Sequence, residues 1–161
     1  MPRSPFTVDD ANALIPTLEE ALDRLESLRA EWTTHMRRAE TLEVMWGELI
    51  FRAENPNHLE YLDIRDCVER TGSAIQNLVE EKIVARGLRF PSGSLEHGII
   101  DFPTTWEGRW IYLCWRRGEP QLTHWHEIDS GFQGRQEIQA EHIITMGREK
   151  GELPNDMGLD F

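Results

Sequence analysis

Apolar residues recur every three to four positions through the first third of the chain, which is the spacing of one face of an α-helix. Thr7 and Asp10 precede this stripe with the spacing of a capping box, in which each side chain accepts a hydrogen bond from the other residue's backbone N–H. The pattern predicts a long helix that begins near residue 8. The stripe consists of Ala11, Leu14, Leu18, Ala21, Leu25, Leu28, Trp32, Met36, Ala39, Leu42, Met45, Leu49 and Ala53.

A second stripe follows the helix-breaking run Asn55-Pro56-Asn57 and stops before Gly87. Two helices joined by a short connection pack antiparallel, so residues 8–86 are predicted to form a long helical hairpin of coiled-coil type. A pair of helices leaves part of each stripe uncovered, and we therefore expect a homodimer. The second stripe consists of Ile64, Val68, Thr71, Ile75, Leu78 and, less regularly, Lys82.

After Gly87 the apolar residues alternate instead, which predicts short strands near residues 88–90, 99–102, 109–116 and 121–126. The expected fold is α+β, with the antiparallel hairpin followed by a small antiparallel β-meander sheet, residues 88–127, packed on it. Residues 128–161 are predicted to form a loop and C-terminal tail, with a short helix or strand near residues 140–146 before a flexible end. All 161 residues are expected to belong to one domain.

The turns Glu107-Gly108 and Arg117-Gly118 determine which side chains share a face of the sheet. If both contain two residues, Asp101 lies opposite Cys114 and Ile111 lies opposite His124. A change of one residue in either turn would exchange the faces of a strand. The expected core face carries Ile100, Phe102, Ile111, Leu113, Trp115, Leu122, His124 and His126. The other face, aromatic enough to suit a protein partner, carries Asp101, Trp110, Tyr112, Cys114, Thr123 and Trp125.

The charge balance narrows the classes of partner. The chain has 29 acidic and 17 basic residues, and its net charge of -12 opposes binding to nucleic acid or to an anionic membrane. No apolar run approaches the ~20 residues of a membrane-spanning helix, so we expect no membrane association. Cys67 and Cys114 are far apart and form no CxxC motif, which favours a reducing, cytoplasmic location.

The sequence His124-Trp125-His126 is the sharpest chemical feature. Alternate residues of a strand point to the same side, so both imidazoles could bind one transition metal ion such as zinc, iron or copper. His35 on the first helix is the expected third ligand. The alternative reading makes His124 a hydrogen-bonded core histidine and His126 a surface histidine at the sheet edge. Other candidates for the third ligand are Glu31, Glu48 and Glu127.

Four further residues have a chemical and a structural interpretation. Arg135, in a glycine-containing loop, could bind an anionic cofactor or pair with an acidic side chain. Trp125 could line a ligand pocket or lie in an interface with Trp110. Asp101 could be a base or a metal ligand, but a turn-capping role beside Pro103 is preferred because it is predicted to face away from both histidines. Cys114 has no histidine on its expected face and is interpreted as structural.

Several of these segments resemble the bacterial family called domain of unknown function 2203. The similarity covers roughly residues 6–137, including the intervening helical hairpin. It implies a shared small fold, and it carries no established activity and no catalytic residues. The matching segments are the run from Phe6 to Pro16, Asp101-Phe102-Pro103, Gly108, the run from Tyr112 to Arg116, Gly118-Glu119-Pro120, His124-Trp125-His126, Gly131-Phe132 and Gly134-Arg135.

Three functions therefore remain open. The first is binding of a transition metal or small ligand through His124 and His126. The second is a non-catalytic dimeric module that docks a protein partner on the aromatic sheet face through Trp110 and Trp125. The third, a metal-dependent enzyme, ranks last because the sequence lacks a complete set of nucleophile, base and orienting group.

Overall fold

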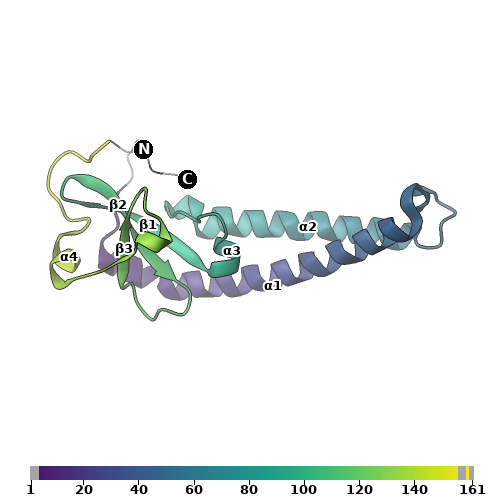
Figure 1. Cartoon of the computed structure of the whole chain (residues 1–161), viewed down its shortest axis with the longest axis horizontal. Coiled ribbons are helices and arrows are strands. Elements are labelled where there is room, and N and C mark those ends of the chain that lie inside the picture. Colours follow the sequence, from purple (N-terminus) through teal and green to yellow (C-terminus); the bar gives the residue numbers. More distant parts are fainter. Residues whose placement is uncertain (1–3, 156–158, 160–161) are drawn as a thin grey trace. The chain divides into compact units, whose positions relative to one another are not determined.

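The computed structural model describes residues 4–155 and 159. The chain divides into two compact units, which we call the sheet unit (residues 1–22 and 79–161) and the hairpin unit (residues 23–78). The longest helix, α1 (Val8–Trp46), contributes to both units. Figure 1 shows the elements of each unit. The mixed α+β class expected from the sequence is confirmed.

The predicted capping box begins α1. The Thr7 backbone N–H donates to Asp10 Oδ2 at 3.1 Å, and the Asp10 N–H donates to Thr7 Oγ1 at 3.1 Å. The Thr7 hydroxyl also donates to Asp10 Oδ2 at 2.6 Å. These hydrogen bonds lower the pKa of the Asp10 carboxyl because they favour its ionised form.

The hairpin unit contains the rest of α1, the short 3₁₀ helix η1 (Gly47–Phe51) and most of α2 (His58–Lys82). The helices run antiparallel, because Trp46 Nε1 donates to Asn57 Oδ1 at 3.0 Å while Arg38, two turns earlier on α1, pairs with Glu60 at 2.7 Å. The predicted helical hairpin is confirmed. Its core near the turn consists of Ala39, Leu42, Ile50, Tyr61 and Ile64.

The sheet unit is built on a four-stranded antiparallel meander in the order β1-β2-β3-β4. The first hairpin is as predicted: Glu107 and Gly108, with φ of 50° and 73°, form a two-residue turn, and Asp101 pairs with Cys114. The strands are β1 (Ile99–Trp106), β2 (Arg109–Arg116), β3 (His124–Glu127) and β4 (Gln136–Glu137). The remaining elements are η2 (Val84–Arg86), α3 (Ser94–His97), η3 (Phe132–Gly134) and α4 (Ala140–Thr145), the last where a short helix or strand was expected.

The predicted pairing of the third strand is wrong. Ile111 lies opposite Glu127 rather than His124, a shift of three residues, and an odd shift moves every side chain of a strand to the other face. The expected turn is present, since the Glu119 N–H donates to the Arg116 carbonyl at 3.0 Å. The residues that follow this turn do not pair with β2 at once. Pro120 has no N–H, and the Leu122 N–H donates to Asn12 Oδ1 of α1 at 2.7 Å.

Both faces of the sheet are buried, which corrects the expectation of an exposed aromatic face. Trp110 is 5% exposed, and its indole N–H donates to the Pro154 carbonyl at 2.9 Å. Leu159 packs against Trp110, so these residues of the predicted flexible tail cover the sheet. Trp125 is also buried, at 3% exposure, and lies on the opposite face from Trp110 because of the altered pairing. Within the described residues, no helix has the length and apolar character needed to cross a membrane.

The capping box provides a first test of this fold. Thr7→Ala removes one side-chain acceptor and should lower the free energy of unfolding by about 1 kcal/mol at neutral pH, measured by urea denaturation. Because the pKa of Asp10 is lowered in the folded state, its contribution is present above the pKa of the unfolded carboxyl and is lost as the pH falls through the folded value.

The control for this test is Thr34→Ala, which removes the same hydroxyl and methyl groups at an exposed position inside the same helix, where the hydroxyl only donates to the Ala30 carbonyl. It should leave stability almost unchanged. Equal effects of the two substitutions would contradict a specific contribution of the capping box.

Candidate metal site

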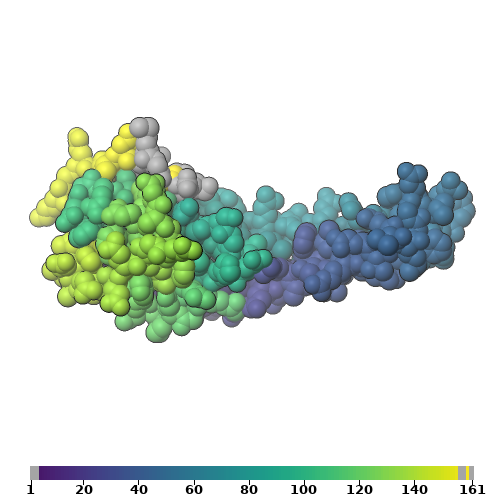
Figure 2. All heavy atoms as spheres, in the orientation of Figure 1, coloured from purple at the N-terminus to yellow at the C-terminus, as the bar shows by residue number. Residues whose placement is uncertain are grey.

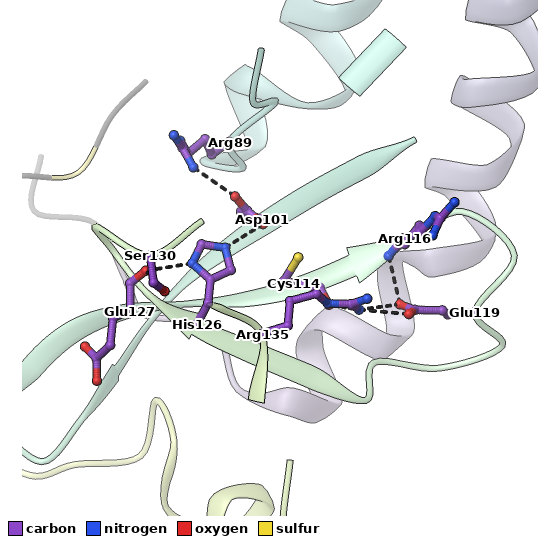
Figure 3. A network of polar contacts seen from close by, with 9 residues as sticks. All are labelled: Arg89, Asp101, Cys114, Arg116, Glu119, His126, Glu127, Ser130 and Arg135. Carbon is purple, nitrogen blue, oxygen red and sulfur yellow. Dashed lines mark hydrogen bonds and ion pairs between the residues drawn. The ribbon is translucent and has the colours of Figure 1, made fainter. Parts of the chain in front are cut away.

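Three neighbouring strands bring Asp101, Cys114 and His126 to one side of the sheet (Figure 3). Asp101 on β1 lies directly opposite Cys114 on β2. Cys114 lies opposite His124, so His126 is its diagonal neighbour on the same face of β3. The three side chains are at most 1% exposed. Their potential ligand atoms all lie within 4.8 Å of one another, the one such group of three found among the described residues.

The separation of these atoms is close to that of metal ligands. His126 Nε2 lies 3.3 Å from Asp101 Oδ1. Ligands of a tetrahedral zinc ion, with bonds of about 2.0–2.3 Å, lie about 3.3–3.8 Å apart. The nitrogen, oxygen and sulfur atoms are also the three donor types that zinc accepts from proteins. The limit of 4.8 Å for the whole group exceeds this range by about 1 Å, so side-chain movements of that order would be needed to place all three around one ion.

The His126 ring is oriented so that its Nε2 atom faces the other two members of the cluster. Its Nδ1 lies 2.7 Å from the backbone carbonyl oxygen of Glu127, and a carbonyl only accepts hydrogen bonds, so Nδ1 carries the hydrogen. Nε2 is left facing Asp101, where it donates when protonated or binds a metal when not. Metal-binding histidines commonly donate their second N–H to a carbonyl in this way, which fixes the ring.

Arg89 supplies the positive charge beside the cluster. Its guanidinium donates to Asp101 Oδ2 at 3.0 Å and lies 5.1 Å from the centre of the Tyr112 ring. Two backbone hydrogen bonds between Arg89 and Asp101, of 2.9 and 3.0 Å, hold the two residues side by side. Because Arg89 uses Oδ2, Asp101 Oδ1 remains directed toward His126 (Figure 3). An arginine in this position orients the carboxylate, although its charge also opposes a cation.

The chemistry of Cys114 differs from that of a catalytic thiol. Burial raises the pKa of the Cys114 thiol, and the negative charge of Asp101 and a hydrogen bond to its carboxylate raise it further. In a nucleophilic triad the histidine lies between the thiol and the carboxylate. Here Asp101 contacts both Cys114 and His126, and the second ring nitrogen of His126 is bound to a carbonyl. A metal ion bound to Cys114 would have to displace this proton, so the raised pKa disfavours metal binding as well as nucleophilic attack.

The other histidines predicted as ligands lie in different surroundings. His124 is half-buried, and its Nδ1 lies 2.8 Å from Thr123 Oγ1. His35 belongs to the hairpin unit, where its Nε2 lies 4.0 Å from Glu31. The alternative prediction, a core His124 and a surface His126, is wrong, because His126 is the buried histidine and His124 the more exposed one.

The two predicted cofactor-binding residues are also part of local networks. The Arg135 guanidinium pairs with the Glu119 carboxylate at 2.8 and 2.9 Å and donates to the Cys114 carbonyl at 3.1 Å (Figure 3). Trp125 packs edge-on against Trp106 and His142, with ring centres 5.2 and 5.7 Å away. The Trp125 indole N–H is buried and has no hydrogen-bond partner among the residues that the structure describes.

From the sequence, Asp101 and Cys114 are each predicted to have a structural role. Their predicted positions opposite each other are confirmed, so two of the three members of the cluster were already placed together. The missing signal was the position of β3. Pro120 has no N–H and signals an interruption of the pairing, but the residue at which pairing resumes, and with it the face of His126, depends on contacts with residues distant in the sequence.

Burial of Cys114 gives a prediction on thiol reactivity. A small thiol reagent at about pH 8 should modify the half-buried Cys67 quickly, and Cys114 only after unfolding in urea, because burial removes access and disfavours the thiolate. Mass spectrometry of Cys67→Ser should therefore show almost no native labelling, whereas Cys114→Ser should label like the wild type. Rapid labelling of folded Cys67→Ser would contradict the closed site.

Comparison with known proteins agrees with the resemblance seen in the sequence. Residues 4–138 match the family described as an uncharacterized conserved protein, DUF2203. Searches of curated proteins and of solved structures found no match. The matched range contains Asp101, Cys114 and His126, the capping box and both long helices. Because the match covers well over half of the sequence, the chain belongs to the DUF2203 family.

Proposed function

We propose that this protein binds one transition metal ion, with zinc as the best fit, through Asp101, Cys114 and His126. One observation carries the proposal: three chemically different ligand groups converge on one buried point, and the imidazole is anchored so that its Nε2 faces the carboxylate. Binding would exchange the thiol proton of Cys114 for the metal. His126 belongs to the metal-binding pair expected from the sequence, whereas Asp101 and Cys114 take the places of His124 and His35.

Because the three ligands are buried, we favour a permanently bound ion rather than the metal ion of a reaction centre. A catalytic zinc ion keeps an open coordination position that substrate can reach. Each proposed ligand is at most 1% exposed, so substrate would need a movement of the sheet surroundings to reach the ion. The metal-dependent enzyme therefore stays the weaker alternative. The homodimer, a protein partner and a cytoplasmic location remain predictions from the sequence.

A competing explanation makes the cluster a purely structural hydrogen-bond network. The buried Asp101 carboxylate needs partners in any case, and Arg89, Cys114 and His126 supply them. This explanation accounts for the burial equally well, but it does not require affinity for a metal. Metal binding by the folded protein separates the two explanations.

Metal content provides that test. Protein purified without an affinity tag and incubated with zinc should retain about one ion per chain after desalting, measured by elemental analysis and native mass spectrometry. His126→Ala and Cys114→Ser should each lose it, with zinc affinity reduced by about 10²-fold or more. Cobalt bound in place of zinc should give a thiolate charge-transfer band that Cys114→Ser removes.

His124→Ala is the matched control, because it removes a neighbouring histidine on the same face of the same strand. It should keep its metal, as should His35→Ala. Equal loss in His124→Ala and His126→Ala would instead support the histidine pair as the ligand set. Absence of zinc, iron and copper binding by the folded wild type would leave the structural network as the explanation.

A further inference from the structure

The end of the hairpin unit exposes an unusual number of large apolar side chains. Figure 2 shows this segment in blue, at the right of the view. We call these residues the tip cluster. They account for six of the eleven exposed large hydrophobic residues that the structure describes, within a stretch of only 19 residues. The tip cluster consists of Val44 (88% exposed), Met45 (60%), Leu49 (47%), Phe51 (62%), Leu59 (75%) and Leu62 (49%).

The hairpin itself does not account for the tip cluster. Its core at this end is formed by Ala39, Leu42, Ile50, Tyr61 and Ile64, which are at most 8% exposed. None of the six tip-cluster residues belongs to this core. Large exposed apolar patches of this kind mark surfaces that bind another macromolecule.

A groove runs through one side of the cluster. It has a volume of about 670 Å³, and Gly47, Phe51, Tyr61 and Leu62 form its apolar wall. Phe51 packs edge-on against Tyr61 at 5.7 Å, so it is held in position although it is largely exposed. The charged residues Glu43, Glu48 and Arg65 complete its lining.

The charges of the groove favour a second copy of the same chain. The Glu48 carboxylate makes no hydrogen bond or ion pair with any residue that the structure describes. Arg65 is 57% exposed and reaches Glu43 only at 3.9 Å, so it retains unused donors. In a two-fold contact each copy would present one unpaired acid and one available base to the other. A chain with a net charge of -12 repels itself elsewhere, which confines self-association to a surface of mixed charge.

The available area is sufficient for such a contact. A fully exposed large apolar residue presents roughly 150–200 Å², so the tip cluster offers on the order of 600 Å² per copy. A contact that covered it on both copies would bury about 1,200 Å² in total, the lower limit of a standard protein interface. This size corresponds to a reversible dimer.

We propose that the tip cluster is the contact surface of a homodimer, with Arg65 of one copy facing Glu48 of the other. The apolar stripe predicted a dimer along the helices in general, and the exposed residues assign it to the turn between α1 and α2. The proposal does not depend on the metal site, because all of its residues lie in the hairpin unit.

Sedimentation velocity over a concentration series tests the dimer. The wild type should change from monomer to dimer, and Phe51→Lys/Leu62→Lys should weaken the dimer by at least about tenfold. The matched control is Ile143→Lys/Ile144→Lys, which places the same charges at exposed apolar residues of α4, and it should dimerise like the wild type. Circular dichroism should show that all three remain folded. A wild type that stays monomeric, or a tip variant that still dimerises, would overturn the proposal.

Exchange of the two charges tests the proposed contact between Arg65 and Glu48 separately. Glu48→Arg and Arg65→Glu should each weaken the dimer, because each places like charges opposite one another. The double variant Glu48→Arg/Arg65→Glu should recover most of the affinity. Failure of the double variant to recover would exclude this arrangement of the groove, and unchanged zinc content in all of these variants would show that the metal site is unaffected.

Discussion

The pairing of β3 with β2 determines which side chains meet on each face of the sheet. Successive side chains of a strand point to opposite faces, so the number of residues between Arg116 and the first pair of β3 decides where both histidines lie. With the observed pairing, His126 joins Asp101 and Cys114, and Trp125 enters the opposite, apolar face. The bond from the Leu122 N–H to Asn12 fixes this pairing by holding the preceding segment against α1.

The buried carboxylate of Asp101 constrains the residues around it, because it needs polar or charged partners. An ionised carboxylate removed from water costs several kcal/mol unless it is paired and hydrogen-bonded. Arg89 provides the opposite charge, while the Cys114 thiol and the His126 ring complete the surroundings. Two of the groups that contact Asp101 in the absence of a metal, the Cys114 thiol and the His126 ring, are also common metal ligands. Under the proposed function, the metal-bound state would exchange the Cys114 proton for a cation.

Regular patterns predicted most of the fold. The helical stripes, the capping box at Thr7 and the turn at Glu107-Gly108 depend on local spacing, and each is confirmed. The position of β3 depends on a contact between Leu122 and Asn12, which are 110 residues apart. No local pattern contains that information. The covering of Trp110 by Pro154 and Leu159 likewise depends on a distant segment.

The candidate site was predicted in part for the same reason. His126 was identified from its chemistry, whereas Asp101 and Cys114 were set aside because pairing assumed directly after the Arg117-Gly118 turn placed both histidines on the other face. Once the pairing is known, Asp101, Cys114 and His126 are seen to share one face, and their residue types are compatible with the proposed metal site.

X-ray absorption spectroscopy at the zinc edge, on the zinc-loaded wild-type protein, tests the central claim most directly. The account predicts one sulfur at about 2.3 Å together with nitrogen and oxygen ligands at about 2.0–2.2 Å, as expected for Cys114, His126 and Asp101. A coordination shell without sulfur would contradict it, because such a shell would place the metal away from Cys114.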